Sequence, residues 1–189
     1  MTQDEVARAV LLTLDRLAIP YVIVGSYASN AWGHPRATHD LDVVVELSES
    51  AAASLAKALG DDFYVSEEGA RRAALIRDMF NLIHIPTGTK VDVWVRPDTD
   101  YERTRWARRV PIQLLGQEVS VATPEDTILA KLVWYRKGGE VSDLQRRDAQ
   151  GVWEVQADRL DRQYLTKWAR TLGIEDLLRG LAGETTSAE

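Results

Sequence analysis

Residues 20–47 read PYVIVGSYASNAWGHPRATHDLDVVVEL, and this stretch carries the pattern that decides the fold. It opens with an apolar run that ends at Gly25 and Ser26, and a short helical pattern follows. A second strand-like run then carries Asp40 and Asp42. The spacing predicts two strands that are connected through a tight turn and a short helix.

The two aspartates of the second run are expected to lie on one face of a strand. Asp40 and Asp42 are two positions apart, and successive side chains of a strand point to opposite faces. Aspartate is uncommon in strands, and neighbouring like charges repel one another. A cation would reverse that cost, and Mg²⁺ usually binds one or two carboxylates together with substrate phosphates. The pair therefore indicates either part of a metal–phosphate site or an edge strand protected by charge.

The turn between the two strands has the features of an anion-binding site. Gly25 follows a strand and Ser26 begins a helix, where free backbone N–H groups and the helix dipole favour negative charge. Glycine also allows an anion to approach the backbone closely. A Gly-Ser pair is as typical of an ordinary turn, so the acids that follow it carry the prediction of phosphate binding.

These features together resemble the signature of the polymerase-β-type nucleotidyltransferase superfamily: an apolar strand, Gly-Ser, a short helix and Asp-Leu-Asp on a second strand. The superfamily implies a third acid on a later strand, and the run KVDVWV supplies Asp92. The R-x-T-x-D-L-D run that begins at Arg36 further resembles bacterial AbiEii-like and minimal nucleotidyltransferases.

This resemblance implies a two-metal site. Asp40, Asp42 and Asp92 would together bind two Mg²⁺ ions, or Mn²⁺ in their place, and would be both the metal ligands and the catalytic residues. Gly25 and Ser26 would hold the triphosphate of an NTP.

Later segments complete the sheet and add helices. Alternating apolar residues predict one hairpin over residues 79–95 and a second that turns at Gly116. Thr123-Pro124-Glu125-Asp126 combines an N-cap, an early proline and acids, so a helix is expected to begin there. Ser142 and Asp158 are expected to begin two further helices.

The fold class expected is α/β (α+β). The resemblance implies a nucleotidyltransferase fold with a mixed, largely antiparallel sheet flanked by helices, followed by a C-terminal helical lobe. No repeat or linker separates the halves. Residues 1–122 are therefore interpreted as the catalytic lobe and residues 123–182 as the helical lobe of the same folding unit. The polar tail, residues 183–189, is expected to be disordered.

Three further side chains are candidates for nucleotide binding. Arg36 lies two positions before Thr38 on the acid-bearing segment, so it would contact phosphate oxygens or neutralise the carboxylates. Lys131 lies among apolar positions of a predicted helix, and either reaches the surface or points into a cleft that holds nucleotide. Ser29 stands where the GSxARG motif of antitoxin nucleotidyltransferases has arginine, and its hydroxyl would contribute a contact to the nucleotide instead.

Composition restricts the classes of protein that are consistent with the chain. Its 189 residues contain no cysteine, so oxygen ligands must hold any metal. A net charge of −6 argues weakly against a tightly held duplex nucleic acid. No apolar run approaches the length of about 18 residues that indicates a membrane span, and the first residues lack the features of a signal peptide. We therefore expect a cytoplasmic protein with no membrane partner.

The resulting hypothesis is a Mg²⁺-dependent transfer of NMP from an NTP to an acceptor hydroxyl, with release of pyrophosphate. The sequence leaves the acceptor open among a small molecule, a protein and RNA. The AbiEii resemblance alone suggests a toxin of a toxin–antitoxin pair, with a cognate antitoxin or toxin protein as partner. The alternative is a catalytically silent module that binds nucleotide or a partner protein on the same fold.

Overall fold

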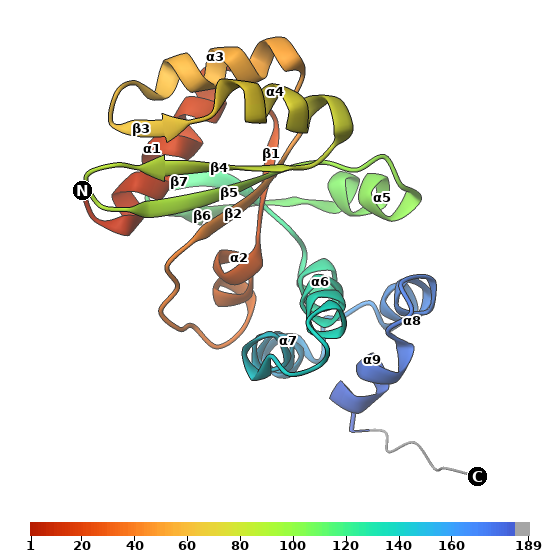
Figure 1. Ribbon diagram of the computed structural model, residues 1–189. Coiled ribbons are helices and arrows are strands. Elements are labelled where there is room, and N and C mark those ends of the chain that lie inside the picture. Colours follow the sequence, from red (N-terminus) through yellow and green to blue (C-terminus); the bar gives the residue numbers. More distant parts are fainter. Residues whose placement is uncertain (184–189) are drawn as a thin grey trace. The chain divides into compact units, whose positions relative to one another are not determined.

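The computed structural model describes residues 1–183, which form two compact units (Figure 1). The first unit comprises Met1–Val24 and Ala37–Val121, and the second comprises Gly25–Arg36 and the chain from Ala122 onward. The tail predicted to be disordered lies outside the described residues, apart from Gly183.

A seven-stranded mixed sheet forms the first unit, in the order β3-β4-β5-β2-β1-β7-β6. The pairs β1–β2, β3–β4, β4–β5 and β6–β7 are antiparallel, and the pairs β2–β5 and β1–β7 are parallel. This arrangement confirms the predicted mixed, largely antiparallel sheet. The strands are β1 (Tyr21–Val24), β2 (Leu41–Val45), β3 (Phe63–Val65), β4 (Met79–His84), β5 (Thr89–Val95), β6 (Val110–Leu114) and β7 (Gln117–Val121).

The helices of the first unit begin at side chains that cap them. Thr2 forms a capping box with Glu5, and Ser48, Ser66 and Thr99 accept hydrogen bonds from backbone N–H groups of the first turn that follows each. The helices are α1 (Gln3–Arg16), α3 (Glu49–Leu59), α4 (Glu67–Ile76) and α5 (Asp100–Arg108).

Helices α1, α3 and α4 lie against one face of this sheet (Figure 1). On β5, Val91, Val93 and Val95 are buried and point to this covered face, whereas Asp92 and Trp94 are half-buried and point to the other face. The alternation that buries the valines thus places the acid of β5 on the face opposite these helices.

Up to residue 183, the helices of the second unit are α2 (Gly25–Trp32), α6 (Pro124–Lys137), α7 (Asp143–Gln156), α8 (Arg162–Thr171) and α9 (Glu175–Leu181). Helix α2 packs against α6 and α7, although it is far from both in the sequence. Leu129, Leu132 and Leu165 are almost completely buried in the core of this unit. Burying each such side chain contributes about 1.5–3 kcal/mol to stability.

Several predicted boundaries differ from the structure. Strand β2 begins at Leu41, so Asp40 lies just before the strand. Ser142 precedes α7, but its side chain makes no capping hydrogen bond. Asp158 does not begin a helix, because α7 ends at Gln156 and the carboxylate of Asp161 accepts the capping hydrogen bond of α8.

The division into units also differs from the predicted lobes in one respect. Residues 25–36 were assigned with the strands that flank them, whereas in the structure they group with the chain from Ala122 onward. The reason is packing: the contacts of α2 are with α6 and α7.

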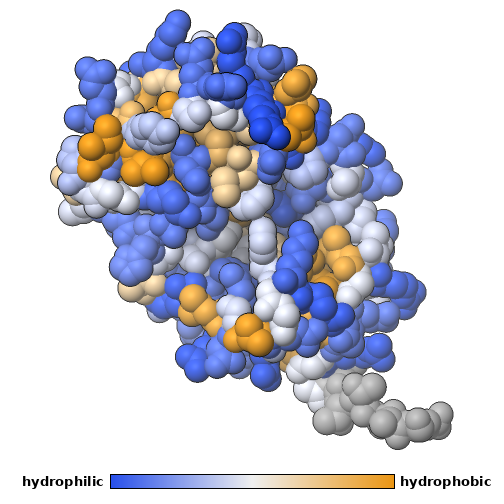
Figure 2. All heavy atoms as spheres, viewed as in Figure 1, coloured by the Kyte–Doolittle hydropathy of each residue, from blue (hydrophilic) through white to orange (hydrophobic). Residues whose placement is uncertain are grey.

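The surface combines polar side chains with small apolar groups. Figure 2 shows the hydrophobic residues of one face as separate patches among hydrophilic ones. Within the described residues, none of the helices combines the length and the apolar character that crossing a membrane requires.

Candidate functional site

Two of the three predicted acids are direct neighbours on the sheet of the first unit. Asp42 of β2 stands opposite Asp92 of β5 in the parallel register. The flanking residues of both strands, Leu41, Val43 and Val91 among them, are buried on the other face. Because the register is fixed by these apolar residues, both carboxylates are held on one face of adjacent strands.

A lysine that the sequence analysis did not select lies at this acid face. Lys90 Nζ donates a hydrogen bond of 2.9 Å to Asp92 Oδ2. This hydrogen bond raises the pKa of Lys90 above its usual value against the opposing effect of burial, and the charges of Asp40 and Asp42 add to the rise. Lys90 and Asp92 are two positions apart on one strand, so the alternation rule that placed the acids would also have placed the lysine.

The other oxygen of Asp92 points to a ligand. Asp92 Oδ1 is buried and has no hydrogen-bond partner in the structure. A buried carboxylate oxygen without a partner is costly, and a cation would satisfy it. Two carboxylates on adjacent strands fit the oxygen donors that Mg²⁺ prefers.

The structure does not bring the three acids into one metal-binding group. Within residues 1–183, no three His, Cys, Asp or Glu side chains gather closely enough to hold a metal ion. Asp40 lies before β2 and is therefore not held by the register that pairs Asp42 with Asp92. The geometry of this unit thus provides a two-carboxylate site, and participation of Asp40 stays a prediction.

The second unit contains the other predicted residues, at the start of α2. Gly25 adopts a left-handed conformation with φ of 61°, which a residue with a Cβ rarely adopts. The side chain of Asn30 accepts from the backbone N–H of Arg36 at 3.1 Å and donates to its carbonyl at 2.7 Å. These contacts hold Arg36 beside the first turn of the helix.

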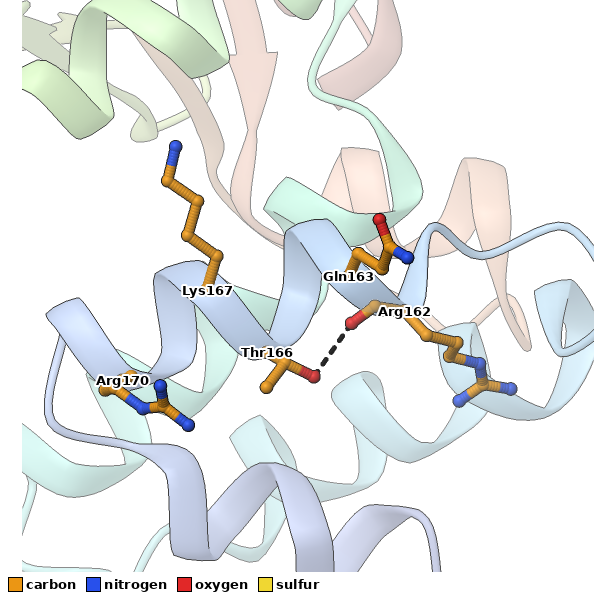
Figure 3. A pocket seen from close by; sticks show the side chains of 5 residues that line it. All are labelled: Arg162, Gln163, Thr166, Lys167 and Arg170. Carbon is orange, nitrogen blue, oxygen red and sulfur yellow. Dashed lines mark hydrogen bonds between the residues drawn. The ribbon is translucent and has the colours of Figure 1, made fainter.

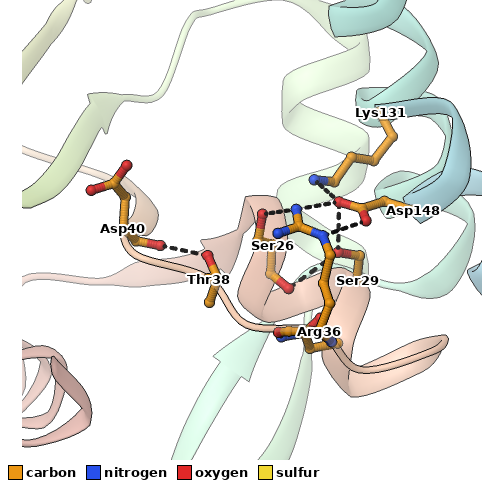
Figure 4. A network of polar contacts seen from close by, with 8 residues as sticks. Ser26, Ser29, Arg36, Thr38, Asp40, Lys131 and Asp148 are labelled. Carbon is orange, nitrogen blue, oxygen red and sulfur yellow. Dashed lines mark hydrogen bonds and ion pairs between the residues drawn. The ribbon is translucent and has the colours of Figure 1, made fainter. Parts of the chain in front are cut away.

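A buried carboxylate gathers these residues into one polar cluster (Figure 4). Arg36 donates two hydrogen bonds of 2.8 Å to Asp148, one to each oxygen, and Lys131 Nζ donates to Asp148 Oδ2 at 2.7 Å. Arg36 also donates to Ser26 Oγ at 2.8 Å. Ser29 Oγ lies 3.1 Å from the Ser26 carbonyl and 3.4 Å from Asp148 Oδ2.

The cations keep Asp148 ionised. Burial raises the pKa of this carboxyl, but the hydrogen bonds from Arg36 and Lys131 outweigh burial and hold the pKa below its usual value. The same hydrogen bond raises the pKa of Arg36. One carboxylate and two cations therefore give the cluster a net positive charge beside the N-terminus of α2.

The predicted nucleotide-binding residues thus have a specific place in the structure. Ser26, Ser29, Arg36 and Lys131 all belong to this cluster. Arg36 pairs with Asp148, which is not one of the predicted acids, so its contact with phosphate oxygens stays a prediction. Sequence reasoning missed Asp148, although an acid beside the buried Ala149 and Val152 of α7 was the available signal.

A separate hollow lies along α8 in the second unit (Figure 3). Its volume is about 450 Å³, and none of the predicted site residues lines it. Two of its cations already have partners, because Arg170 pairs with Glu175 at 3.2 Å and Arg162 lies 3.7 Å from the ring centre of Trp153. The lining residues are Arg162, Gln163, Thr166, Lys167 and Arg170.

Comparison with known sequences identifies no relative. No protein-family model matches the chain, and no curated protein matches it either.

Comparison with solved structures does find matches across nearly the whole chain. An antigenic nucleotidyltransferase-like protein from Paracoccidioides brasiliensis aligns with a TM-score of 0.56 at 18% identity, covering 98% of this chain and 94% of that one. The antibiotic-resistance factor ANT(2'')-Ia aligns with a TM-score of 0.59 at 12% identity, covering 96% and 93%. The lincosamide antibiotic adenylyltransferase LnuA aligns with a TM-score of 0.50 at 9% identity, covering 75% and 90%.

At these identities the matches show the fold. The chain has the nucleotidyltransferase fold, which confirms the predicted fold class. These structures do not support the AbiEii-like branch in particular.

Proposed function

We propose that the protein is a nucleotidyltransferase that transfers NMP from an NTP to an acceptor hydroxyl and releases pyrophosphate. The observation that carries this proposal is the acid face of a nucleotidyltransferase fold, where Asp42 and Asp92 stand in register and Asp92 Oδ1 is buried without a partner. Such an oxygen is the donor that a divalent cation would take up.

In this proposal Asp42 and Asp92 hold Mg²⁺, and Asp40 completes the set if it approaches them. A bound Mg²⁺ supplies charge neutralisation on the phosphates and makes the acceptor hydroxyl more acidic. The acceptor oxygen forms a bond to the α-phosphorus while the bond from that phosphorus to the bridging oxygen breaks, and pyrophosphate leaves. Asp92 is our candidate to accept the hydroxyl proton.

The cluster around Asp148 supports the nucleotide-binding part of the proposal. Arg36 and Lys131 are held in place by Asp148, and together with the positive end of the α2 dipole they favour an anion near Ser26. Gly25, Ser26 and Ser29 are proposed as the contacts of the triphosphate.

The structural neighbours support a proposal for the acceptor. ANT(2'')-Ia has been solved with adenylyl-2''-tobramycin and LnuA with lincomycin, so both act on small antibiotics. We propose by analogy an ATP donor and a small-molecule hydroxyl acceptor, in a cytoplasmic enzyme. A toxin role with a cognate antitoxin rests on the sequence resemblance alone.

A thermal-shift titration with each NTP, with and without Mg²⁺, tests the proposal. A ligand at 100 times its dissociation constant should raise the melting midpoint by roughly 5–10 °C for a chain of this size. A Mg²⁺-dependent shift with one NTP, followed by transfer of its labelled α-phosphate, would establish the activity. The absence of any shift in a protein that melts cooperatively would contradict it.

The silent binding module is the second candidate function. It is favoured by the hydrogen bond from Lys90, which already neutralises one of the acids. A shift with NTP that needs no metal, together with no transfer to any hydroxyl acceptor, would support this second function over the first.

A further inference from the structure

The position of Lys90 on the acid face calls for a functional explanation. Its ammonium donates to one oxygen of Asp92 while the other oxygen of the same carboxylate stays buried and unpartnered. Neutralisation of Asp92 by Lys90 alone does not explain why the second oxygen has no hydrogen-bond partner. One oxygen of the carboxylate therefore accepts from an internal cation, and the other remains able to bind a ligand.

The two partners differ in exposure to solvent. The side chain of Lys90 is 38% exposed, whereas that of Asp92 is 14% exposed. Lys90 therefore reaches the carboxylate from the solvent side on a flexible stem, and it loses little when it swings away. Asp92 is fixed on a central strand between β2 and β4.

The charges of the acid face set the consequence of metal binding. Asp40, Asp42 and Asp92 all act on the Lys90 ammonium electrostatically. The two carboxylates held in register and the one ammonium leave one negative charge, so a bound divalent cation would make the acid face net positive. A metal that takes up both oxygens of Asp92 would displace the ammonium from this carboxylate. Because Mg²⁺ usually binds carboxylates together with substrate phosphates, the anion that comes with the metal is the phosphate chain of the nucleotide.

We propose that Lys90 is an exchangeable counter-ion of the metal site: it occupies Asp92 before metal binds, and it then transfers its hydrogen bond from Asp92 to the phosphates of the nucleotide. This inference rests on the proposed function. It makes Lys90 a specificity element that favours metal and nucleotide together over either one alone.

Metal binding without nucleotide provides the first readout. In Lys90→Met the competing charge is gone, so the dissociation constant for Mn²⁺ alone, measured from free Mn²⁺ by electron paramagnetic resonance, should fall by roughly tenfold. Lys57→Met on α3 removes the same charge from an exposed position, and it should leave the constant unchanged.

Nucleotide binding in saturating Mg²⁺ provides the second readout, and here the opposite sign is expected. Lys90→Met should weaken ATP binding by about tenfold in calorimetry, because one cationic contact to the phosphates is lost. Lys90→Arg, which keeps the charge and the donors, should retain ATP binding closer to that of the wild type. A fixed neutralising lysine predicts instead that both affinities rise or stay unchanged, and this result would overturn the proposal.

The two proposals fail in different ways. If the wild type binds Mn²⁺ and ATP, Asp92→Asn abolishes the metal binding and Lys90→Met changes neither constant, then only the role of Lys90 is wrong. If the wild type binds no Mn²⁺ but Lys90→Met does, then Lys90 blocks the site permanently and is not exchangeable. If neither protein binds metal, both proposals are wrong.

Discussion

At the scale of single residues, the two carboxylates in register make opposite contributions to stability and to the proposed reaction. Asp42 and Asp92 stand side by side on adjacent strands, where like charges repel. The apolar residues on the other face hold this arrangement in place. The two charges reduce local stability. Substitutions that remove one of them should therefore lower the proposed activity without unfolding the protein.

Asp42→Asn should therefore separate activity from stability. We expect transfer of the labelled NMP to fall by about two orders of magnitude or more, because one of the two carboxylates that we propose to bind the metal is lost. The melting midpoint should stay the same or rise slightly, since the repulsion from Asp92 is relieved. Glu118→Gln on β7 removes one charge from a solvent-exposed position of the same sheet and serves as the control. Full transfer activity in Asp42→Asn would eliminate this site.

In contrast to Asp42, Asp148 is expected to stabilise the fold, so its removal should lower the free energy of unfolding. Asp148→Asn leaves Lys131, a side chain only 5% exposed, without its carboxylate. Breaking such a buried pair costs about 3–5 kcal/mol. Urea unfolding at pH 7 should show this loss, and the double variant Lys131→Met with Asp148→Leu should recover part of it.

The same pair gives a pH dependence whose sign follows from the lowered pKa of Asp148. A carboxyl whose pKa is lowered in the folded state stabilises the fold when the pH is above its pKa in the unfolded chain, which is about 3.9. This contribution is lost as the pH falls through the lower pKa of the folded state. The difference in unfolding free energy between wild type and Asp148→Asn should thus be constant from pH 7 to about 5 and shrink below about 4. A difference that grew on acidification would contradict the assignment.

Sequence reasoning found the acids but not their partners, and the reason is physical. Asp40, Asp42 and Asp92 are visible because aspartate is out of place in an apolar strand. Lys90 and Asp148 are ordinary residues in their local context, and their roles depend on which side chains the fold brings to them. Arg36 and Lys131 were selected as candidates for nucleotide binding, which stays a prediction, whereas the carboxylate that pairs with both is distant from each in the sequence.

At the scale of elements, a close approach between α2 and α7 organises the second unit. A Cβ added at Gly33 would lie 2.7 Å from Val152 N and 2.9 Å from the carbonyl carbon of Gly151. Both atoms belong to the backbone of α7, so they cannot move aside as a flexible side chain does. The absence of a side chain at Gly33 is what allows the chain after α2 to contact this helix.

Gly33→Ala should accordingly destabilise the protein by about 1–3 kcal/mol through overpacking. Gly180→Ala is the matched control, because a Cβ there meets nothing within 4 Å and lies in α9. That control should be neutral or stabilising by up to about 1 kcal/mol. Chemical unfolding of both variants gives the comparison, and equal stabilities would show that the approach of α2 to α7 is not tight.

Most elements were predictable from local signals, and the exceptions have local causes. The capping box at Thr2, the proline after Thr123 and the turn at Gly116 each identify an end that the structure confirms. Asp158 and Asp161 are equally good caps by residue type. Which of them begins α8 depends on where α7 ends, and sequence pattern does not determine that position.

At the scale of the whole molecule, the two compact units are not two continuous stretches of the sequence. Helix α2 is encoded between two strands of the sheet but belongs with α6 and α7. Pairings such as Ile23 with Val121 are also remote in the sequence. Neither relation has a local signature, so the order of the strands and the membership of α2 were beyond prediction from pattern alone.

A fragment of residues 122–189 should for this reason fail to fold on its own. It lacks Arg36 and Ser29, which contact the buried Asp148, as well as the apolar face of α2. We expect a broad, non-cooperative thermal transition by circular dichroism. Adding residues 25–36 through a flexible Gly/Ser linker should restore cooperative melting. A sharp transition in the shorter fragment would show that α2 is dispensable.

The membership of α2 also sets an order of events during synthesis. A ribosome that adds about 5–20 residues per second produces α2 well before α7, and until Asp148 emerges the guanidinium of Arg36 has no buried carboxylate to meet. Strand β1 likewise waits for β7 to form its second pairing. The nascent chain must therefore carry an eight-residue helix unpaired across most of its translation, and such a short helix is only marginally stable in water. The cluster around Asp148 is consequently completed in one of the last steps of folding, so a prematurely terminated chain would lack it.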